Sequence, residues 1–424
     1  MLEEILDRRN IERALESVEA NKGSSGIDDM PWNMLRPYIN ANWQQLRKSI
    51  LEECYKPKPV REVEIDKSSG GKRKLGIPTV IDRMITQAIT QWLMPKYEEN
   101  FSNRSYGFRP KRNAHQAVLQ AQNYLNEGKR WVIEFDLENF FDKVNHDRLM
   151  SILSRKVNDK RTLKLIRLYL TSGIMAGGVT STRSEGTPQG SPLSPLMSNV
   201  ILDELDRELE KRGHSFVRYA DDISVYVSSK ASAERVMESI INFVERKLLL
   251  KVNRKKTKIS TPEESVLLGF SFRVFKGSYI IKIARRSVER IKQKFKAITL
   301  RSKSISETER ITQLNTIIRG WVNYFKIAMA KTLMQHIDGN VRTRLRMCNW
   351  KQWKNIRTRR RNLLELGADK RTAREHSRSR LGYCRIAQTY VLCTTLTVSY
   401  YRKHGYVGFY DLYHNKTEKQ MKLF

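Results

Sequence analysis

The stretch FVRYADDISVYV, residues 216–227, decides how this chain is interpreted. Apolar residues alternate with other residues on both sides of an Ala-Asp-Asp corner, a pattern that is typical of a β-hairpin. Such a hairpin carries two adjacent carboxylates, Asp221 and Asp222, at its tip, where a metal ion could reach them. Aspartate is also an ordinary turn former, because its side chain bonds its own backbone and tolerates left-handed geometry. Taken alone, the pair is therefore equally consistent with a solvated turn.

A second stretch supplies a third carboxylate. WVIEFDL, residues 131–137, is typical of a buried strand, and Asp136 stands near its end. If this strand pairs beside the hairpin, Asp136, Asp221 and Asp222 converge on one site. Mg²⁺ takes oxygen ligands, usually one or two carboxylates together with substrate phosphates, and such an arrangement serves phosphoryl transfer.

Length and composition bound the remaining possibilities. A chain of 424 residues predicts two or three domains, and 40% hydrophobic residues are enough for a sizeable core. With 79 Lys and Arg against 45 Asp and Glu, the net charge is +34, which indicates a polyanionic partner, most commonly nucleic acid. A membrane surface is the rival partner. However, no run of about 18 apolar residues occurs, and the N-terminus is acidic and amphipathic rather than a signal peptide.

The four cysteines suggest neither zinc nor disulfides. No C-x-x-C pair occurs among Cys54, Cys348, Cys384 and Cys393. The pattern fits a reducing compartment, so we expect a cytoplasmic protein.

Two segments have the chemistry to hold phosphates. Alternating runs around residues 68–72, SSGGK, predict a glycine-tipped hairpin whose basic side chains, including Arg61, Lys67 and Arg73, could clamp a triphosphate. A solvated basic face is the alternative, and on the hairpin alone it is favoured. GTPQGSPLSP, residues 186–195, precedes a long helix, whose N-terminus presents free N–H groups.

Two other segments suit nucleic-acid contact. Residues 101–110, FSNRSYGFRP, interleave aromatic rings with arginine, as in surfaces that stack bases and bind phosphates, although a loop pinned by buried aromatics is equally consistent. Residues 342–361 hold nine basic and no acidic residues, with two tryptophans between them. A calmodulin-type target or a nuclear signal is the weaker alternative there. The candidate contacts are Arg109, Lys111, Arg112, Arg344, Lys351 and Arg357.

The order of these motifs carries a family resemblance. FDLENFFDKVNH, then GTPQGSPLSP, YADD and LGF, is similar to the palm of reverse transcriptases. The further set KGSSGID, GGKRKLGIP, YGFRPKRNAHQAV, PQGSPLSPLMSN and GWVNYF resembles the group II intron reverse transcriptase/maturase family over about residues 20–330. Because the paired cysteines and histidines of the family's endonuclease do not follow, we expect the endonuclease-lacking branch.

The resemblance implies an α+β fold of the right-hand polymerase type. Fingers and palm, with an N-terminal extension, would occupy residues 1–284. An α-helical thumb, called the maturase or X domain, would span 285–365, where apolar residues recur at helical spacing. A small basic DNA-binding domain would span 366–424.

The implied function is that of an RNA-directed DNA polymerase encoded by a group II intron. Such a protein binds its intron RNA, assists splicing and retrohoming, and copies an RNA template from a DNA primer or target with dNTPs. By the resemblance, Asp136, Asp221 and Asp222 bind two Mg²⁺ ions, for which Mn²⁺ can substitute, with the Leu137 carbonyl as a further ligand.

The family's nucleotide-binding positions can also be carried over. Lys67 and Arg73 match the triphosphate positions, Arg61 is a weaker match, and Gln189 matches the motif beneath the incoming nucleotide. Phe141 falls where a bulky residue under the sugar would clash with a 2′-hydroxyl, with Phe140 as the fallback.

Three other interpretations remain open on the sequence. One is another palm-type reverse transcriptase of the retron, diversity-generating or CRISPR-associated kind. Another is an RNA-binding splicing cofactor without polymerase activity. The three retained carboxylates argue against it, because a protein that has lost catalysis need not keep them. The third is a basic membrane- or DNA-packaging protein, which explains the charge but none of the ordered motifs.

Overall fold

The computed structural model describes residues 1–66, 71–176, 179–181, 184–188 and 190–421. The chain forms two compact units, Met1–Pro262 and Glu263–Phe424, and each is described by itself. Residues 263–284, which the sequence analysis grouped with the palm, belong to the second unit. The boundary expected at 365/366 stays a prediction.

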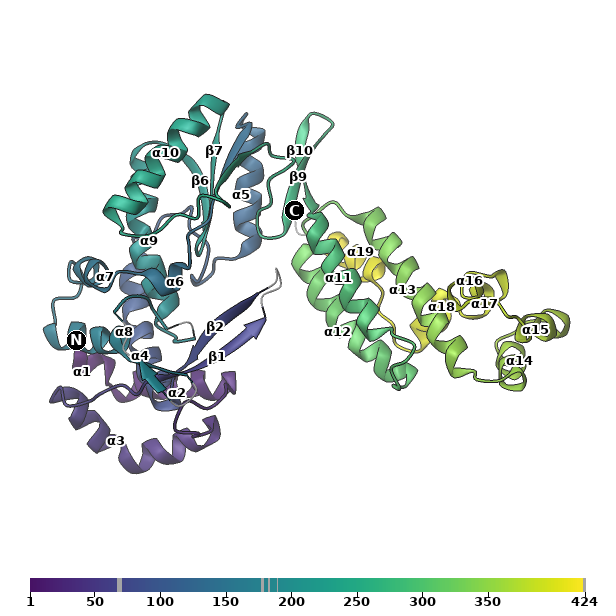
Figure 1. The fold of residues 1–424 in the computed structure, drawn as a ribbon, viewed down its shortest axis with the longest axis horizontal. Helices are drawn as coiled ribbons and strands as arrows, with labels where there is room; N and C mark the ends of the chain where they lie inside the picture. Colours follow the sequence, from purple (N-terminus) through teal and green to yellow (C-terminus); the bar gives the residue numbers. More distant parts are fainter. Residues whose placement is uncertain (67–70, 177–178, 182–183, 189, 422–424) are drawn as a thin grey trace. The chain divides into compact units, whose positions relative to one another are not determined.

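The predicted hairpin and its neighbouring strand form a four-stranded antiparallel sheet in the first unit. Its strands are β3 (Trp131–Phe135), β6 (Ser215–Tyr219), β7 (Asp222–Val227) and β8 (Lys258–Ser260), in the order β6-β7-β3-β8. The central strands are buried on both faces, which explains why their sequences are almost continuously apolar. Helices α5 (Ala114–Asn126), α9 (Ser194–Lys211) and α10 (Lys230–Lys247) pack against this sheet (Figure 1).

A second sheet contains the predicted basic hairpin. Strands β1 (Val60–Asp66) and β2 (Lys72–Ile77) pair antiparallel, from Arg61 opposite Ile77 to Asp66 opposite Lys72. The sheet continues through β4 (Ile174–Ala176), which is parallel to β1, and β5 (Val179–Ser181). The hairpin is confirmed, while its tip at 67–70 lies outside the described residues.

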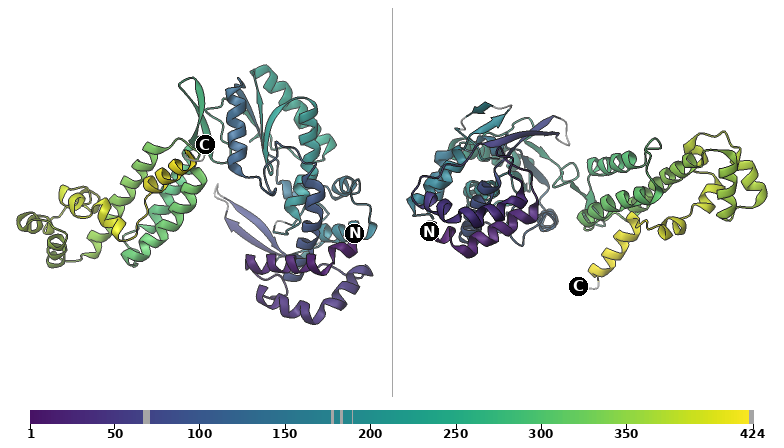
Figure 2. Two further views of the ribbon diagram at one scale, coloured as in Figure 1. Left: turned by 180° about the vertical axis from the view of Figure 1, so that it is seen from behind. Right: turned by 90° about the horizontal axis from the view of Figure 1, so that it is seen from below.

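Helices near the N-terminus lie together at the bottom of the first unit in Figure 1, and Figure 2 shows them from two further sides. Their buried side chains share one hydrophobic core with the β6-β7-β3-β8 sheet, named the palm sheet from here on. α2 (Arg8–Asn21) packs on α4 (Val80–Glu98) through Ile11, Leu15 and Val18, which recur at helical spacing. The other elements of this part are α1 (Leu2–Ile5), η1 (Trp32–Met34), α3 (Leu35–Leu51), α6 (Phe140–Lys143), α7 (His146–Leu153) and α8 (Lys160–Thr171).

A buried carboxylate ties the entry of β1 to this helical core. Asp82 of α4 accepts hydrogen bonds from the hydroxyls of Tyr55 (2.6 Å), Thr79 (2.7 Å) and Tyr169 (3.2 Å) and from the backbone N–H of Lys58 (3.2 Å). Burial raises the pKa of Asp82, and these donors oppose the rise. The strand that begins at Val60 is therefore anchored to both α4 and α8.

The second unit is a small hairpin followed by helices. Strands β9 (Phe270–Phe275) and β10 (Ser278–Ile283) precede α11 (Arg285–Ile298), α12 (Glu307–Phe325) and α13 (Lys331–Gln352), which pack together. The Ser306 side chain caps the start of α12 by accepting the Glu309 N–H. The remaining helices are α14 (Ile356–Glu365), α15 (Lys370–Ser377), α16 (Tyr383–Ile386), α17 (Tyr390–Thr395), α18 (Val398–Lys403) and α19 (Phe409–Met421).

The fold is α+β, as predicted. Among the described helices, none combines the length and the apolar character that crossing a membrane requires.

Candidate active site

The register of the palm sheet brings the predicted carboxylates to one end. Phe135 pairs with Ile223, so one residue further along the same register Asp136 faces Asp222. Tyr219 also pairs with Asp222, which closes β6 and β7 with a two-residue turn and places Asp221 at its tip. Asp136 is half-buried, Asp221 is half-buried and Asp222 is exposed.

Mutual repulsion is visible in the electrostatics of this end. Desolvation, followed by the charges of Asp221, Asp136 and Glu134, raises the pKa of Asp222 to about 6. Asp222 is exposed, so neighbouring protein atoms remove only part of the water around its carboxylate. The charges of the nearby carboxylates add to the rise in its pKa. A cation at this position would relieve the repulsion.

Lys256 supplies one positive charge, and the sequence analysis did not single it out. Its ammonium lies 3.4 Å from Asp136 Oδ2 and opposes the rise in the pKa of Asp222. The loop that carries it is fixed to Asp136, because the Asn253 N–H donates to the Asp136 carbonyl (2.8 Å) and the Asp136 N–H donates to Thr257 Oγ1 (3.3 Å). Lys256 lies in the run KKTK, residues 255–258, and nothing in one sequence tells which lysine of such a run faces the carboxylates.

The donor chemistry of the three aspartates fits a hard divalent cation. Carboxylate oxygens are the ligands that Mg²⁺ prefers. The side chains do not form a closely spaced group of three metal ligands, nor does any other set of His, Cys, Asp or Glu within the described parts of the chain. The backbone register, rather than the present side-chain rotamers, is what brings these carboxylates together.

The GTPQGSP segment is bound directly to the turn that follows Asp136. The Thr187 N–H donates to the Phe141 carbonyl (2.6 Å), and the Gly186 N–H donates to the Val144 carbonyl (2.8 Å). His146 Nε2 lies 2.6 Å from the Gly186 carbonyl. Gly186 has φ of +88°, and a Cβ there would lie 2.8 Å from the Asp142 backbone, so only glycine fits. Gln189, in the same segment, lies outside the described residues.

The two phenylalanines after Asp136 occupy different environments. Phe140 is 3% exposed and belongs to the core, whereas Phe141 is half-buried and meets Phe140 edge to face at 5.2 Å between ring centroids. Phe141 is therefore the better candidate for contact with a nucleotide, and this role stays a prediction.

Comparisons with known proteins agree with this geometry. A model of the family "Reverse transcriptase (RNA-dependent DNA polymerase)" matches residues 65–272, and a model of "Group II intron, maturase-specific domain" matches residues 288–367. The chain belongs to the group II intron reverse transcriptase/maturase family. It is therefore an intron-encoded RNA-directed DNA polymerase, and divalent-metal dependence and binding to intron RNA come with that membership.

Individual relatives support the assignment. Protein YkfC of Escherichia coli (strain K12) is 35% identical over 272 residues, which cover 55% of this chain and 71% of YkfC. Group II intron-encoded protein LtrA of Lactococcus lactis subsp. cremoris is 26% identical over 412 residues, which cover 74% of this chain and 68% of LtrA. Among solved structures, the "Partial Cas6-RT-Cas1--Cas2 complex" matches with a TM-score of 0.38 and 24% identity over 58% of this chain and 42% of its own, too low a similarity to argue from.

The nucleotide-binding positions implied for this reverse transcriptase are only partly described. Arg61 lies on β1 and forms an ion pair with Asp29 at 2.6 Å. Arg73 lies on β2, where its backbone pairs with that of Ile65 on β1. Lys67 lies outside the described residues. The structure thus provides the hairpin, and its contacts with a triphosphate stay predictions.

One predicted nucleic-acid contact has a structural role instead. Arg109 is 7% exposed and donates to the Glu98 carboxylate through Nε and Nη2, to the Glu98 carbonyl, and to the carbonyls of Ser102 and Ser105 through Nη1. These bonds use the guanidinium of Arg109 inside the protein. Of the two interpretations of residues 101–110, a loop held in place by buried side chains is therefore the one that fits Arg109, rather than contact with nucleic acid. Lys111 is exposed, and Arg112 is half-buried and bonds the Asn103 side chain at 2.7 Å.

The basic stretch 342–361 divides between two helices, α13 and α14. Trp350 is 2% exposed and belongs to the core, so it does not stack on a base. Arg344 is half-buried, and its Nε donates to Thr299 Oγ1 at 2.6 Å, while burial lowers its pKa. Lys351 and Arg357 are exposed and remain candidate nucleic-acid contacts.

The raised pKa of Asp222 leads to a prediction for the metal-free protein. Because the folded state raises this pKa above its ordinary value of 3.8, the stability that protonated Asp222 contributes is lost as the pH rises through about 6. In EDTA, Asp222→Asn should therefore melt a few degrees above the wild type at a pH of about 8. The difference should shrink as the pH falls from about 6 toward 3.8, and it should vanish only below 3.8, where this side chain is protonated in both the folded and the unfolded wild type. Thermal unfolding followed by circular dichroism measures both.

Glu138→Gln, at an exposed position nearby, is the matched control and should show no such pH-dependent gain. Added Mg²⁺ should raise the melting temperature of the wild type more than that of Asp222→Asn, because an ion that binds the folded state stabilises it. A variant that is no more stable than the wild type at the higher pH would contradict the repulsion described above.

Proposed function

We propose that Asp136, Asp221 and Asp222 hold two Mg²⁺ ions, replaceable by Mn²⁺, with the Leu137 carbonyl as a further ligand. The observation that supports this most directly is the β3–β7 register, which puts Asp136 opposite Asp222 and beside Asp221. Ions held by these carboxylates would supply Lewis-acid chemistry, which would lower the pKa of the primer 3′-hydroxyl and neutralise charge on the departing pyrophosphate.

The chain's own part in this reaction is positioning. The carboxylates stand on paired strands of a buried sheet, and the loop with Lys256 is tied to Asp136. Positioning and electrostatic stabilisation supply most of the rate enhancement in phosphoryl transfer, so a rigid sheet suits the task. The dNTP would lie between this end of the sheet and the β1–β2 hairpin, held by Arg61, Lys67, Arg73 and Gln189.

The binding partners follow from charge and family. The net charge of +34 exceeds what one nucleotide needs, and the maturase-specific domain favours the group II intron family over other palm-type reverse transcriptases. We infer that the protein binds its intron RNA, assists splicing and retrohoming, and accepts an RNA template with a DNA primer or target. Its place of action would be the cytoplasm.

Primer extension tests the proposed function. Wild-type protein with a heteropolymeric RNA template, a DNA primer, dNTPs and Mg²⁺ should produce full-length cDNA. Asp222→Asn should lose about 100- to 1,000-fold or more in rate, since it removes charge aimed at the reacting groups. Asp147→Asn, whose side chain is 80% exposed on α7, is the control and should retain full activity.

The outcomes separate the functional alternatives. Measurable synthesis by Asp222→Asn at the wild-type rate would exclude the assignment of the carboxylates. Absence of cDNA from the wild type, with tight RNA binding retained, would instead support a splicing cofactor without polymerase activity.

The half-buried Phe141 leads to a prediction about sugar selection. If its ring excludes a 2′-hydroxyl, Phe141→Ala should raise incorporation of rNTPs relative to dNTPs by about tenfold or more, a typical effect of steric exclusion in a pocket. Single-nucleotide incorporation kinetics with each substrate measure the ratio. Phe140→Leu, a change in the core, should lower stability and leave the ratio unchanged, and an unchanged ratio in Phe141→Ala would assign that ring to core filling.

A further inference from the structure

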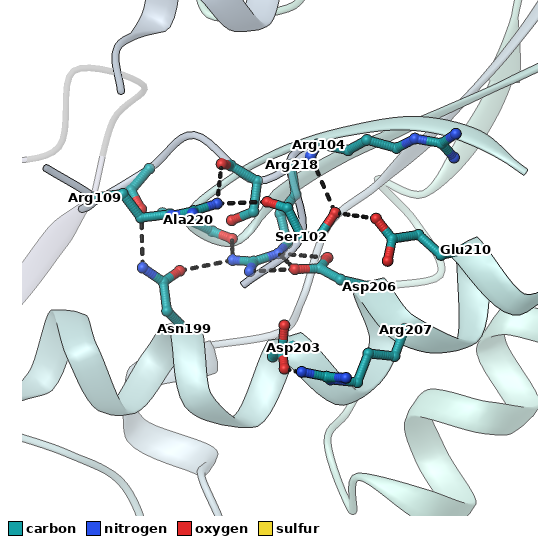
Figure 3. Close-up of polar contacts among 12 residues, drawn as sticks. Ser102, Arg104, Arg109, Asn199, Asp203, Asp206, Arg207, Glu210, Arg218 and Ala220 are labelled. Carbon is teal, nitrogen blue, oxygen red and sulfur yellow. Dashed lines mark hydrogen bonds and ion pairs between the residues drawn. The ribbon is translucent and has the colours of Figure 1, made fainter. Parts of the chain in front are cut away.

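A fully buried arginine lies directly beneath the turn that carries Asp221. Arg218 stands on β6, and its side chain is 0% exposed (Figure 3). Its backbone is paired on the outer edge of the sheet, where its N–H donates to the Arg104 carbonyl (2.9 Å) and its carbonyl accepts the Tyr106 N–H (2.8 Å). The segment 104–106 therefore runs beside β6 and holds that strand from the side away from β7.

The charge of Arg218 is balanced by an equally buried partner on α9. Asp206 is 0% exposed, and it accepts from Arg218 Nε at 2.8 Å and from Nη2 at 2.5 Å. Two carboxylate oxygens facing one guanidinium make the bidentate geometry that is specific to arginine. Because a buried charge without a partner is costly, this pair fixes where the guanidinium stands relative to α9.

The remaining nitrogen of Arg218 reaches the catalytic turn. Nη1 donates to the Ala220 carbonyl at 3.1 Å and to Asn199 Oδ1 at 2.9 Å (Figure 3). Ala220 has φ of +57°, a left-handed conformation that is uncommon for alanine. The contact with Arg218 stabilises this conformation from below, and the conformation decides the direction in which Asp221 and Asp222 leave the turn.

Gly107 also packs directly against this turn. A Cβ at Gly107 would lie 2.2 Å from the Ala220 nitrogen, so only glycine allows this close approach. Asn199 joins the two supports, since its Nδ2 donates to the Gly107 carbonyl at 2.9 Å while its Oδ1 accepts from Arg218. Both the buried ion pair and the 104–109 segment therefore hold this turn.

We propose that Arg218 is a positioning residue for the metal site of this reverse transcriptase. It touches neither the substrate nor an ion, and it acts by holding Ala220 so that Asp221 and Asp222 point toward Asp136. The proposal rests on the proposed function, in which these carboxylates hold the two ions. Lysine cannot replace arginine here, because its three donors sit on one atom and cannot span Asp206, Asn199 and the Ala220 carbonyl together.

The test compares Arg218→Lys with the wild type and with Arg148→Lys. Arg148 is a matched control, since it also pairs with a carboxylate of α9, Glu204 at 3.2 Å, and has no bond to the turn. Two quantities are measured on the full chain with an RNA template. The first is the Mg²⁺ dependence of kcat and the dNTP KM in primer extension. The second is Mn²⁺ binding, followed by electron paramagnetic resonance, in the complex with a dideoxy-terminated primer and dNTP.

Arg218→Lys should bind Mn²⁺ about 10- to 100-fold more weakly and require correspondingly more Mg²⁺, the usual cost of losing a residue that orients a metal ligand. Its kcat should fall while the dNTP KM and the affinity for template-primer stay unchanged. A smaller fraction of folded protein would also lower kcat, but it would not change the Mg²⁺ dependence of the folded enzyme, so the weaker metal binding identifies the positioning role. Arg148→Lys should match the wild type in Mn²⁺ binding. Wild-type Mn²⁺ binding and Mg²⁺ dependence in Arg218→Lys would overturn the proposal.

A second variant keeps the proposal testable if Arg218→Lys does not fold. Asn199→Ala retains the Arg218–Asp206 pair and removes only the links to Arg218 Nη1 and Gly107, so it should weaken Mn²⁺ binding in the same direction and to a smaller extent. Unchanged Mn²⁺ binding in Asn199→Ala would also overturn the proposal. A wild-type protein that neither binds Mn²⁺ nor extends the primer would instead overturn the proposed function itself.

Discussion

The antiparallel pairing of β3 with β7 is the constraint on which the active site depends, because it alone puts Asp136 opposite Asp222. A slip of one residue would turn every side chain of a strand to the other face of the sheet. The buried residues Ile133 and Val225, which are both 0% exposed and pair directly, make such a slip costly. The hydrophobic core of the palm therefore sets the register, and the register sets the spacing of the carboxylates.

That spacing brings several negative charges close together, and the surrounding structure offsets part of this charge and holds the loops that carry it. Desolvation first, and then the charges of Asp221 and Asp136, raise the pKa of Asp222, and Lys256 offsets part of the charge at Asp136. Three loops converge on the same end of the sheet. The 253–257 loop bonds to Asp136, the 186–187 segment bonds to the turn after it, and the 104–107 segment supports the turn that carries Asp221. These hydrogen bonds and close contacts keep a cluster of like charges preorganised for a divalent cation.

Much of this arrangement could be predicted from the sequence, for a physical reason. The alternating pattern of 216–227 and the apolar run of 131–135 are local signals, and local periodicity predicted both the hairpin and its neighbour. The partners of individual polar side chains are not local. Arg218 and Asp206 lie on different elements, and the tertiary fold alone decides that both are buried together. Arg109 and Trp350 show the same limit, since composition predicted nucleic-acid contacts and packing placed both inside the protein. Lys256 could not be told from its basic neighbours, because the register of a loop has no sequence period.

The most direct measurement is anomalous diffraction at the manganese edge from crystals of the protein with an RNA template, a dideoxy-terminated DNA primer, a matching dNTP and Mn²⁺. The account predicts two anomalous peaks at the end of the palm sheet, within coordination distance of Asp136 and of the Asp221–Asp222 pair. Well-ordered dNTP and primer with no anomalous peak at these carboxylates, or with manganese bound to other residues, would contradict it.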